Sequence, residues 1–278
     1  MAEIFKLLCV LAHPDDESLG LGSTLAKYGA EGVETYLVMA TRGERGEQPI
    51  QPQPKSGPDL QAASKTRSSE LHAAARVLGI HQVTFLDYVD GELDHAVPGE
   101  VVGRIVSQLR RIRPQVVITF GPDGTYGHPD HVAISQLTTA AVVSAADPAY
   151  YDPLGLASHR VSKLYYQTTD NDLVRVFSSV FGELAFQVDG VARGWVTWPD
   201  WAHSARIDAT DYWRMALQAI RCHQSQAGLF GELECLPLEQ QRQLWGQRTF
   251  YRAFSLVNGG RRIEKDLFEG LRVADYQV

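Results

Sequence analysis

The chain has 278 residues, of which 44% are hydrophobic and 21% charged, and its net charge is −7. This size suits one large α/β domain. Because the net charge is negative and no block of Lys and Arg stands out, we expect no nucleic-acid partner. No apolar run reaches the roughly 18–20 residues of a membrane span, and the N-terminus lacks the basic-then-apolar order of a signal peptide. The 3 cysteines are scattered and indicate no disulfide framework, so we expect a cytoplasmic protein.

Strands alternate with helices along the first half of the chain. Short apolar runs predict the strands, and amphipathic spacing predicts the helices between them. The expected strands are 6–12, 33–40, 83–86 and 115–120, and the expected helices are 18–30, 64–78 and 101–112. This alternation predicts a Rossmann-like α/β fold, with a mostly parallel sheet and helices on its faces, because right-handed crossovers join parallel neighbours.

The second half of the chain has a weaker pattern. Residues 48–58 form a predicted loop that is long enough to cover a site. A boundary at 147–157 is expected to divide a metal-binding core (1–150) from a smaller α+β elaboration (151–278) that packs on the core as one compact unit and closes the site. The elements expected beyond it are short strands near 161–167, 191–197 and 249–256 and a helix from about 209 to 222.

Two clusters of metal-ligand residues follow two of the predicted strands. Residues 13–17 read His-Pro-Asp-Asp-Glu after the first strand, and residues 128–131 read His-Pro-Asp-His after the fourth. Because ligands bind at the carboxyl ends of parallel strands, we expect the clusters to meet. Three His or Asp ligands leave a fourth position for water, and this mixture suits zinc, with Fe(II), Co(II) or Mn(II) as substitutes. One such motif alone is also common at turns and helix caps, so the prediction depends on both.

Six stretches of the chain recur in one order in a known family. They are residues 12–17, 41–47, Arg67 with Glu70, Asp90-Gly91, 128–131 and 223–226. On these stretches the sequence resembles the LmbE-like (PIG-L) N-deacetylases, which include deacetylases of GlcNAc-phosphatidylinositol and of mycothiol and bacillithiol biosynthesis. Pro14 and the run 43–46 make it more similar to the mycothiol-type branch, which deacetylates GlcNAc-inositol, than to the bacillithiol type.

The resemblance implies a metal and catalytic roles for the site. The implied ligands of one zinc ion are His13, Asp16 and His131. Asp15 would be the general base, and His128, oriented by Asp130, would stabilise the oxyanion as an imidazolium or act as an acid. Tyr126 matches a position where a tyrosine hydroxyl assists the oxyanion.

The resemblance also implies three substrate-binding residues, Arg67, Asp90 and Glu47. Each has an ordinary alternative. Arg67 could form a surface ion pair with Glu70, Asp90 could be part of a turn before a glycine, and Glu47 could belong to a solvated loop of charges.

Two further features stay open at this stage. Trp195, Trp198 and Trp201 could stack on a sugar, form a subunit contact or simply pack in the C-terminal region. His223 could interact with the end of the helix before it, or help to form one wall of the site.

The function implied is a zinc-dependent hydrolase that removes an N-acetyl group from an N-acetylglucosamine-type sugar or its conjugate, a small-molecule substrate. One alternative is an amidase of a thiol conjugate or another N-acyl substrate. Another alternative is a metallophosphoesterase. Such an enzyme would usually need a second metal and more bridging carboxylates, and the sequence offers no clear second set of ligands. A metal-dependent sugar-binding protein without turnover could dispense with Asp15, whose presence counts against it. The exact substrate, the native metal and the formation of a homo-oligomer are left open.

Overall fold

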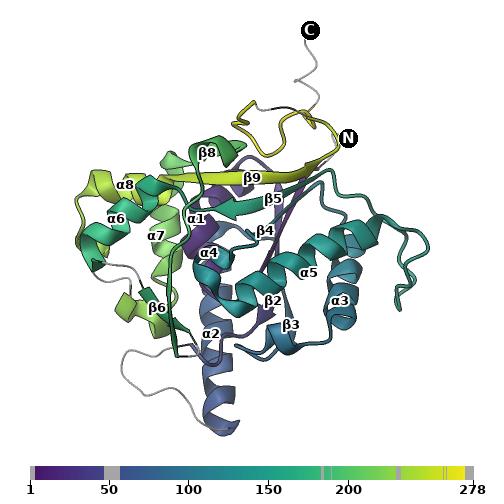
Figure 1. Ribbon diagram of the computed structural model, residues 1–278, viewed down its shortest axis with the longest axis horizontal. Helices are drawn as coiled ribbons and strands as arrows, with labels where there is room; N and C mark the ends of the chain where they lie inside the picture. The colour runs from purple at the N-terminus through teal and green to yellow at the C-terminus, as the bar shows by residue number, and fades with distance from the viewer. Residues whose placement is uncertain are drawn as a thin grey trace.

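Seven strands form one mixed sheet through the middle of the protein (Figure 1). The structure, a computed structural model, describes residues 4–46, 57–182, 185–188, 190–229, 233–258, 260 and 262–272. The strands of the sheet are β1 (Lys6–Leu11), β2 (Glu34–Thr41), β3 (Gln82–Tyr88), β4 (Val116–Phe120), β5 (Lys163–Thr168), β8 (Ala205–Asp208) and β9 (Gln247–Ser255). Their order across the sheet is β3-β2-β1-β4-β5-β9-β8.

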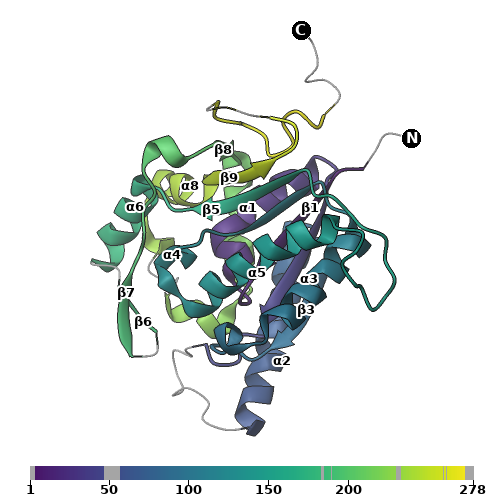
Figure 2. The same cartoon turned by 45° about the vertical axis from the view of Figure 1, so that its right-hand side comes forward.

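Helices cover both faces of this sheet. They are α1 (Asp16–Ala30), α2 (Gly57–Leu78), α3 (Pro98–Ile112), α4 (Gly124–Gly127), α5 (Pro129–Ala146), α6 (Asn171–Phe181), α7 (Trp213–Ile220) and α8 (Leu238–Gly246). On one face α3 contacts α5, and on the other α1, α2 and α7 contact one another (Figures 1 and 2). A separate hairpin of β6 (Ala185–Val188) and β7 (Val191–Gly194) lies beside α4.

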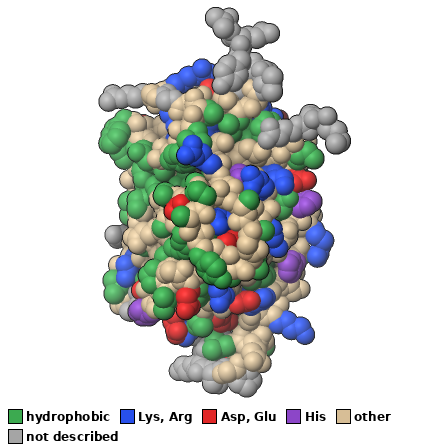
Figure 3. Space-filling view, turned by 90° about the vertical axis from the view of Figure 1, so that its right-hand side faces the viewer, with side chains coloured by type: hydrophobic (Ala, Val, Ile, Leu, Met, Phe, Trp, Pro, Cys, Tyr) green, Lys and Arg blue, Asp and Glu red, His purple; other side chains and the backbone are tan. Residues whose placement is uncertain are grey.

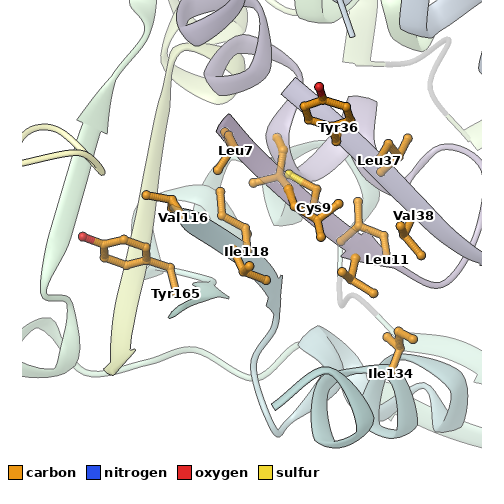
Figure 4. Packing of buried hydrophobic residues seen from close by; sticks show 14 of the residues in the cluster. Leu7, Cys9, Leu11, Tyr36, Leu37, Val38, Val116, Ile118, Ile134 and Tyr165 are labelled. Atoms are coloured by element: carbon orange, nitrogen blue, oxygen red, sulfur yellow. The ribbon is translucent and has the colours of Figure 1, made fainter. Parts of the chain in front are cut away.

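The central strand β1 is buried on both of its faces. Its side chains from Leu7 to Leu11 are fully buried. In Figure 4, Leu7, Cys9 and Leu11 lie between Leu37 of β2 and Ile118 of β4. A continuous apolar run is what a parallel strand with helices on both sides requires, and the sequence of β1 supplies it.

The order and direction of the strands place a reversal of the sheet topology beside β1. Strands β1 to β5 pair in parallel, whereas β9 and β8 pair antiparallel at the far edge. From β1 the chain passes outward through β2 and β3, then crosses back to place β4 on the other side of β1. Such a reversal is a topological switch point, where ligands bind at the carboxyl ends of the strands.

The predicted Rossmann-like, mostly parallel α/β sheet is confirmed. The predicted strands and helices of the first half are all present, although α2 begins at Gly57, earlier than expected. Residues 47–56, which make up most of the predicted loop 48–58, lie outside the described residues. The sheet continues past residues 147–157 through β5, β9 and β8, and the division into a core and an elaboration stays a prediction.

The second half differs from its expected elements in several places. Strands β5 and β9 occur where they were expected, but β7 pairs with β6 outside the main sheet. The helix expected at about 209–222 is shorter, because the turn η3 (Thr210–Tyr212) precedes α7. The elements α6, α8, β6 and β8 were not predicted.

The surface bears charged side chains of both signs (Figure 3). On the face drawn in Figure 3, Lys and Arg side chains are interspersed with Asp and Glu rather than gathered in one basic patch. Among the described residues, no helix has both the length and the apolar character needed to cross a membrane.

Candidate metal centre and active site

Two loops at the switch point bring the predicted site residues together. The first joins β1 to α1 and contains His13, and the second runs from β4 through α4 into α5 and contains His128. Both have backbone in the left-handed region at a non-glycine residue, with φ of 117° at Asp15 and 69° at Thr125. Such conformations cost free energy and are concentrated at functional sites, where the surrounding structure holds them.

Three of the predicted ligands converge on one point. The Nδ1 atom of His13 lies 3.2 Å from Nε2 of His131. The carboxylate of Asp16 lies 3.8 Å from Nδ1 of His13 and 3.5 Å from Nε2 of His131. All three ligand atoms lie within 4.8 Å of one another, a cluster that could hold a metal ion.

Hydrogen bonds on the outer nitrogens fix how both rings face this point. Nε2 of His13 lies 3.1 Å from a carboxylate oxygen of Asp130 and 3.1 Å from one of Asp90, and Nδ1 of His131 lies 3.2 Å from the carbonyl oxygen of Gly124. These oxygens only accept, so the outer nitrogens hold the ring protons. When both rings are neutral, the inner nitrogens turn their lone pairs toward each other over 3.2 Å, and a cation between them relieves this repulsion. This donor set fits a divalent metal with outer hydrogen-bond partners.

Electrostatics points to the same need for a cation. Burial opposes charge on His13, but Asp90, Asp130 and Asp16 outweigh it and raise the pKa of His13 well above its ordinary value. Burial and the positive charge at His13 lower the pKa of His131 to about 3. The raised pKa of His13 favours a proton on its inner nitrogen when no metal is bound, and this nitrogen then donates to His131.

A second group of potential ligands, His13, His128 and Asp130, is less suited to a metal. The Asp130 side chain is fully buried and accepts hydrogen bonds from the backbone N–H groups of Gly91, at 2.8 Å, and Leu93, at 3.0 Å. With His13 as a third donor, this carboxylate is already satisfied. It orients the ring of His13 and joins the loop after β3 to the site.

The structure revises the expected relation between Asp130 and His128. The Asp130 carboxylate contacts His13, while its backbone N–H donates to Nδ1 of His128 over 3.2 Å. Nδ1 of His128 is thus an acceptor, and Nε2 holds the ring proton. Burial and the positive charges at His13 and His131 lower the pKa of His128 to about 3. The expected imidazolium is therefore not favoured, and a neutral ring with an Nε2–H donor takes its place.

Asp15 stands beside the ligand cluster, and its carboxylate faces Arg67. The distance from Oδ2 of Asp15 to a terminal nitrogen of Arg67 is 3.0 Å. Burial raises the pKa of Asp15 to about 7, although the charge of Arg67 opposes this. Arg67 also donates to the carbonyl oxygens of Pro14 and Gly43. Its buried side chain positions Asp15 and two loops, and its contact with substrate stays a prediction.

The glycines of residues 43–46 are explained by their approach to Arg67. A Cβ atom on Gly43 would lie 2.6 Å from Cζ of Arg67, and one on Gly46 would lie 2.0 Å from its Nη1. Gly43 also has a φ of 65°. Only a residue without a side chain fits against the guanidinium at these positions. The loop after β2 therefore encloses Arg67.

The other two expected substrate residues have different outcomes. Asp90 is buried, with one carboxylate oxygen 3.1 Å from Nε2 of His13 and the other accepting from the backbone N–H of Arg45 over 2.9 Å. In this structure Asp90 orients the ring of His13, and its contact with substrate stays a prediction. Glu47 lies outside the described residues.

Tyr126 lies against the histidines, in a turn that sequence reasoning did not explain. Its ring is edge-on to His128 and His131, with centroids 5.9 and 5.4 Å away. The turn is held by Asp123, which accepts from the backbone N–H of Thr125 over 3.0 Å and from the indole N–H of Trp198 over 2.9 Å. Trp198 thus braces the second site loop.

The other two tryptophans of the segment 195–201 and the residue Glu17 have different surroundings. Trp195 contacts Phe177 of α6, and Trp201 is 85% exposed. His223 is buried and contacts Glu17, whose place in the first motif was visible in the sequence but was given no role.

Sequence comparison places this site in a known family. Residues 8–142 match the PIG-L family, described as GlcNAc-PI de-N-acetylase. The 1D-myo-inositol 2-acetamido-2-deoxy-alpha-D-glucopyranoside deacetylase of Streptomyces avermitilis is 33% identical, over 96% of this chain and 97% of the relative. A mycothiol S-conjugate amidase of Streptomyces coelicolor is 29% identical, over 98% of this chain and 99% of the amidase.

Solved structures share the fold. The N,N'-diacetylchitobiose deacetylase from Pyrococcus horikoshii has a TM-score of 0.65 at 22% identity and covers 89% of this chain and 83% of its own. GalB, a 4-carboxy-2-hydroxymuconate hydratase from Pseudomonas putida, has a TM-score of 0.67 at 19% identity and covers 92% and 99%. A deacetylase and a hydratase thus share this fold, which alone does not decide the reaction. Because the Streptomyces avermitilis relative is similar along almost the full length of both chains, the protein belongs to the PIG-L (LmbE-like) family.

Proposed function

We propose that the protein is a zinc-dependent hydrolase that removes the N-acetyl group from an N-acetylglucosamine-type sugar, most simply one linked to inositol. The observation that supports this best is the convergence of His13, Asp16 and His131 beside a carboxylate, Asp15, that is not part of the ligand group. The named activities of the Streptomyces avermitilis relative and of the family agree with it. Fe(II) or Co(II) would fit the same ligands.

Each part of the site has a task in amide hydrolysis. When bound, zinc supplies Lewis-acid polarisation of the amide carbonyl and lowers the pKa of water towards ~7. Asp15 accepts the proton of the attacking water on its carboxylate and then delivers it to the leaving amine. The Nε2–H of His128, with the Tyr126 hydroxyl beside it, donates to the oxygen on which negative charge develops.

Buried partners keep these groups in place. Arg67 holds the Asp15 carboxylate at 3.0 Å, and Asp130 and Asp90 hold the ring of His13. Because the donors are fixed before the substrate arrives, little reorganisation is needed during the reaction, which is the main requirement for stabilising a developing charge.

The test is a substrate panel. Release of acetate is measured from N-acetylglucosaminyl inositol, free N-acetylglucosamine and N,N'-diacetylchitobiose, with added zinc and with a chelator. A parallel arm measures amide cleavage in a mycothiol S-conjugate, because a relative is named for that activity. We expect acetate release that zinc supports and the chelator abolishes. Cleavage of the thiol conjugate alone would favour the amidase, and tight sugar binding without turnover would favour a binding protein.

A matched pair of variants separates the metal from the rest of the site. His131→Ala removes an inner ligand nitrogen and should lose both zinc and turnover. His159→Ala removes a histidine whose Nε2 contacts the carbonyl oxygen of Pro114, outside the site, and should keep both. Full zinc content in His131→Ala would contradict the ligand assignment. The cytoplasmic location and the homo-oligomer considered from the sequence stay predictions.

A further inference from the structure

The backbone of Asp15 is held by the side chain of Glu17. Asp15 immediately precedes α1 with φ of 117° and ψ of −26°, a conformation that L residues rarely adopt. Its backbone N–H donates to Oε2 of Glu17 over 3.0 Å. Glu17 is fully buried, so water does not compete for this hydrogen bond. The carboxylate of Glu17 therefore stabilises the backbone conformation that directs Asp15.

Glu17 is in turn held by a segment from the far end of the chain. Its Oε1 lies 2.8 Å from Nε2 of His223, 206 positions away in the sequence, and also accepts from the hydroxyl of Ser18 over 2.5 Å. His223 is buried three residues beyond the end of α7. Both oxygens of Glu17 are thus engaged, one by the Asp15 backbone and one by the C-terminal part of the protein.

The same C-terminal segment also holds the helix that presents Arg67. Two residues after His223, the backbone N–H and the hydroxyl of Ser225 donate to the two carboxylate oxygens of Glu70, over 2.8 and 2.6 Å. Glu70 is on α2, one turn after Arg67. Arg67 is the residue that contacts the Asp15 carboxylate. One short segment is therefore joined to both supports of Asp15, namely Glu17 for its backbone and α2 for its carboxylate.

We propose that residues 223–225 form a latch that positions Asp15 for catalysis through Glu17 and through Glu70 on α2. Glu17, Glu70, His223 and Ser225 are positioning residues in this proposal, because none of them is required to touch substrate. The inference rests on the proposed function, in which Asp15 is the base. It assigns a task to the C-terminal segment that the ligand set does not require.

The latch predicts a loss of rate without a loss of binding. In Glu17→Ala the Asp15 backbone loses its acceptor, and we expect kcat to fall about 100-fold, since a shift of ~1 Å in a reacting group has that effect. KM and zinc content should stay within about twofold, because no ligand or substrate contact changes. Glu17→Gln keeps an oxygen acceptor for the Asp15 N–H and should recover most of kcat. Ser225→Ala removes one of the two hydrogen bonds from the segment to Glu70 and should lower kcat about tenfold.

The control must separate positioning from general loss of stability. Glu264→Ala removes another buried, ion-paired glutamate, which lies near the amino end of β5 and away from the site. This variant should lower the unfolding temperature while kcat stays unchanged. A second readout does not depend on turnover. In crystal structures of zinc-free Glu17→Ala and Ser225→Ala, the Asp15–Arg67 contact of 3.0 Å should lengthen by about 1 Å.

The outcomes distinguish the two proposals. Unchanged kcat and an unchanged Asp15–Arg67 contact in both variants overturn the latch, as does a fall in kcat that merely follows the fall in zinc content. If Glu17→Ala does not fold, Ser225→Ala decides the question. If the wild-type protein cleaves no amide in the panel, the proposed function fails, while the crystallographic comparison still shows whether the latch positions Asp15.

Discussion

Two buried clusters of charged residues lie at opposite ends of the parallel strands, one after their carboxyl ends and one near their amino ends. The histidine cluster, His13, Asp16 and His131, follows the carboxyl ends of β1 and β4. The glutamate cluster, at the start of β5, comprises Lys163, Tyr165, Arg252, Asn258 and Glu264. Both clusters are removed from water, and an unpaired charge is costly in such buried surroundings. They differ in how completely their groups are paired.

In the glutamate cluster every acceptor oxygen of Glu264 meets a donor. Oε1 lies 2.8 Å from Nζ of Lys163, 2.8 Å from Nδ2 of Asn258 and 2.9 Å from Arg252, and Oε2 accepts from the hydroxyl of Tyr165. In the histidine cluster the two inner nitrogens lie 3.2 Å apart, and both present lone pairs when the two rings are neutral. A balanced cluster stabilises the fold, whereas an unbalanced one is ready to receive a cation. Pairing, and not burial, therefore separates structure from function here.

The largest expected effect is at the histidine cluster. Asp15→Asn keeps the size of the side chain but removes its ability to accept a proton. We expect kcat to fall about 10³-fold, or ~4 kcal/mol in activation free energy. Zinc content should be unchanged, because Asp15 is outside the ligand group. Single-turnover rates and metal analysis of the same sample check this, and near-normal turnover at full zinc content would remove Asp15 from the mechanism.

The glutamate cluster should respond in the opposite way. Glu264→Gln leaves the buried charge of Lys163 without its partner, and removing one member of a buried pair costs about 3–5 kcal/mol. We expect urea unfolding to show this loss, while kcat and zinc content of the folded protein stay at wild-type values. A large change in kcat at a temperature where the variant is folded would mean that the glutamate cluster is coupled to the histidine cluster.

A smaller effect is expected at the loop that encloses Arg67. The Cβ atom of Gly46→Ala would lie 2.0 Å from Nη1 of Arg67, so the guanidinium that contacts Asp15 must shift. We expect kcat to fall about tenfold at unchanged zinc content. The matched control is Gly99→Ala in α3, where a Cβ meets no atom within 4 Å. Equal kcat in the two variants would show that the position of Arg67 is not critical.

The smallest expected effect is a dependence of stability on pH. Burial alone would raise the pKa of Glu264, but hydrogen bonds from Lys163 and Tyr165 outweigh it and hold the pKa below its ordinary value of 4.5. The stability gained from the ionised group is therefore fully present above that value and is lost as pH falls through the folded pKa. The gap in unfolding free energy between wild type and Glu264→Gln should shrink over this acid range. A gap that widens on acidification would reverse the sign of the shift.

Local sequence patterns predicted the centre of the sheet and the grouping of the site. The apolar run of β1 has the composition of a strand buried on both faces, and each motif places its residues directly after a strand. Strand direction then brings His13 and His131 to one edge, and hence the members of the ligand group could be named from spacing and family resemblance together.

The partners of the buried carboxylates could not be read in this way. Asp130 is two residues from His128, yet its side chain binds His13 and the N–H groups of residues 91 and 93. Glu17 binds His223, 206 positions away. Which donor a carboxylate meets depends on side-chain direction and on packing between distant elements, and neither leaves a periodic signal. The antiparallel addition of β9 and β8 is a long-range pairing of the same kind.

The order of the strands has a consequence for synthesis of the chain. The central strand β1 emerges from the ribosome first, but its neighbour β4 and the last member of the histidine cluster, His131, follow much later. A nascent chain released up to α5 holds all three members of the histidine cluster, while His223 and Ser225 are still to come. We therefore expect metal capture to precede catalytic competence during translation, with hydrolysis beginning only when the last third of the protein has docked.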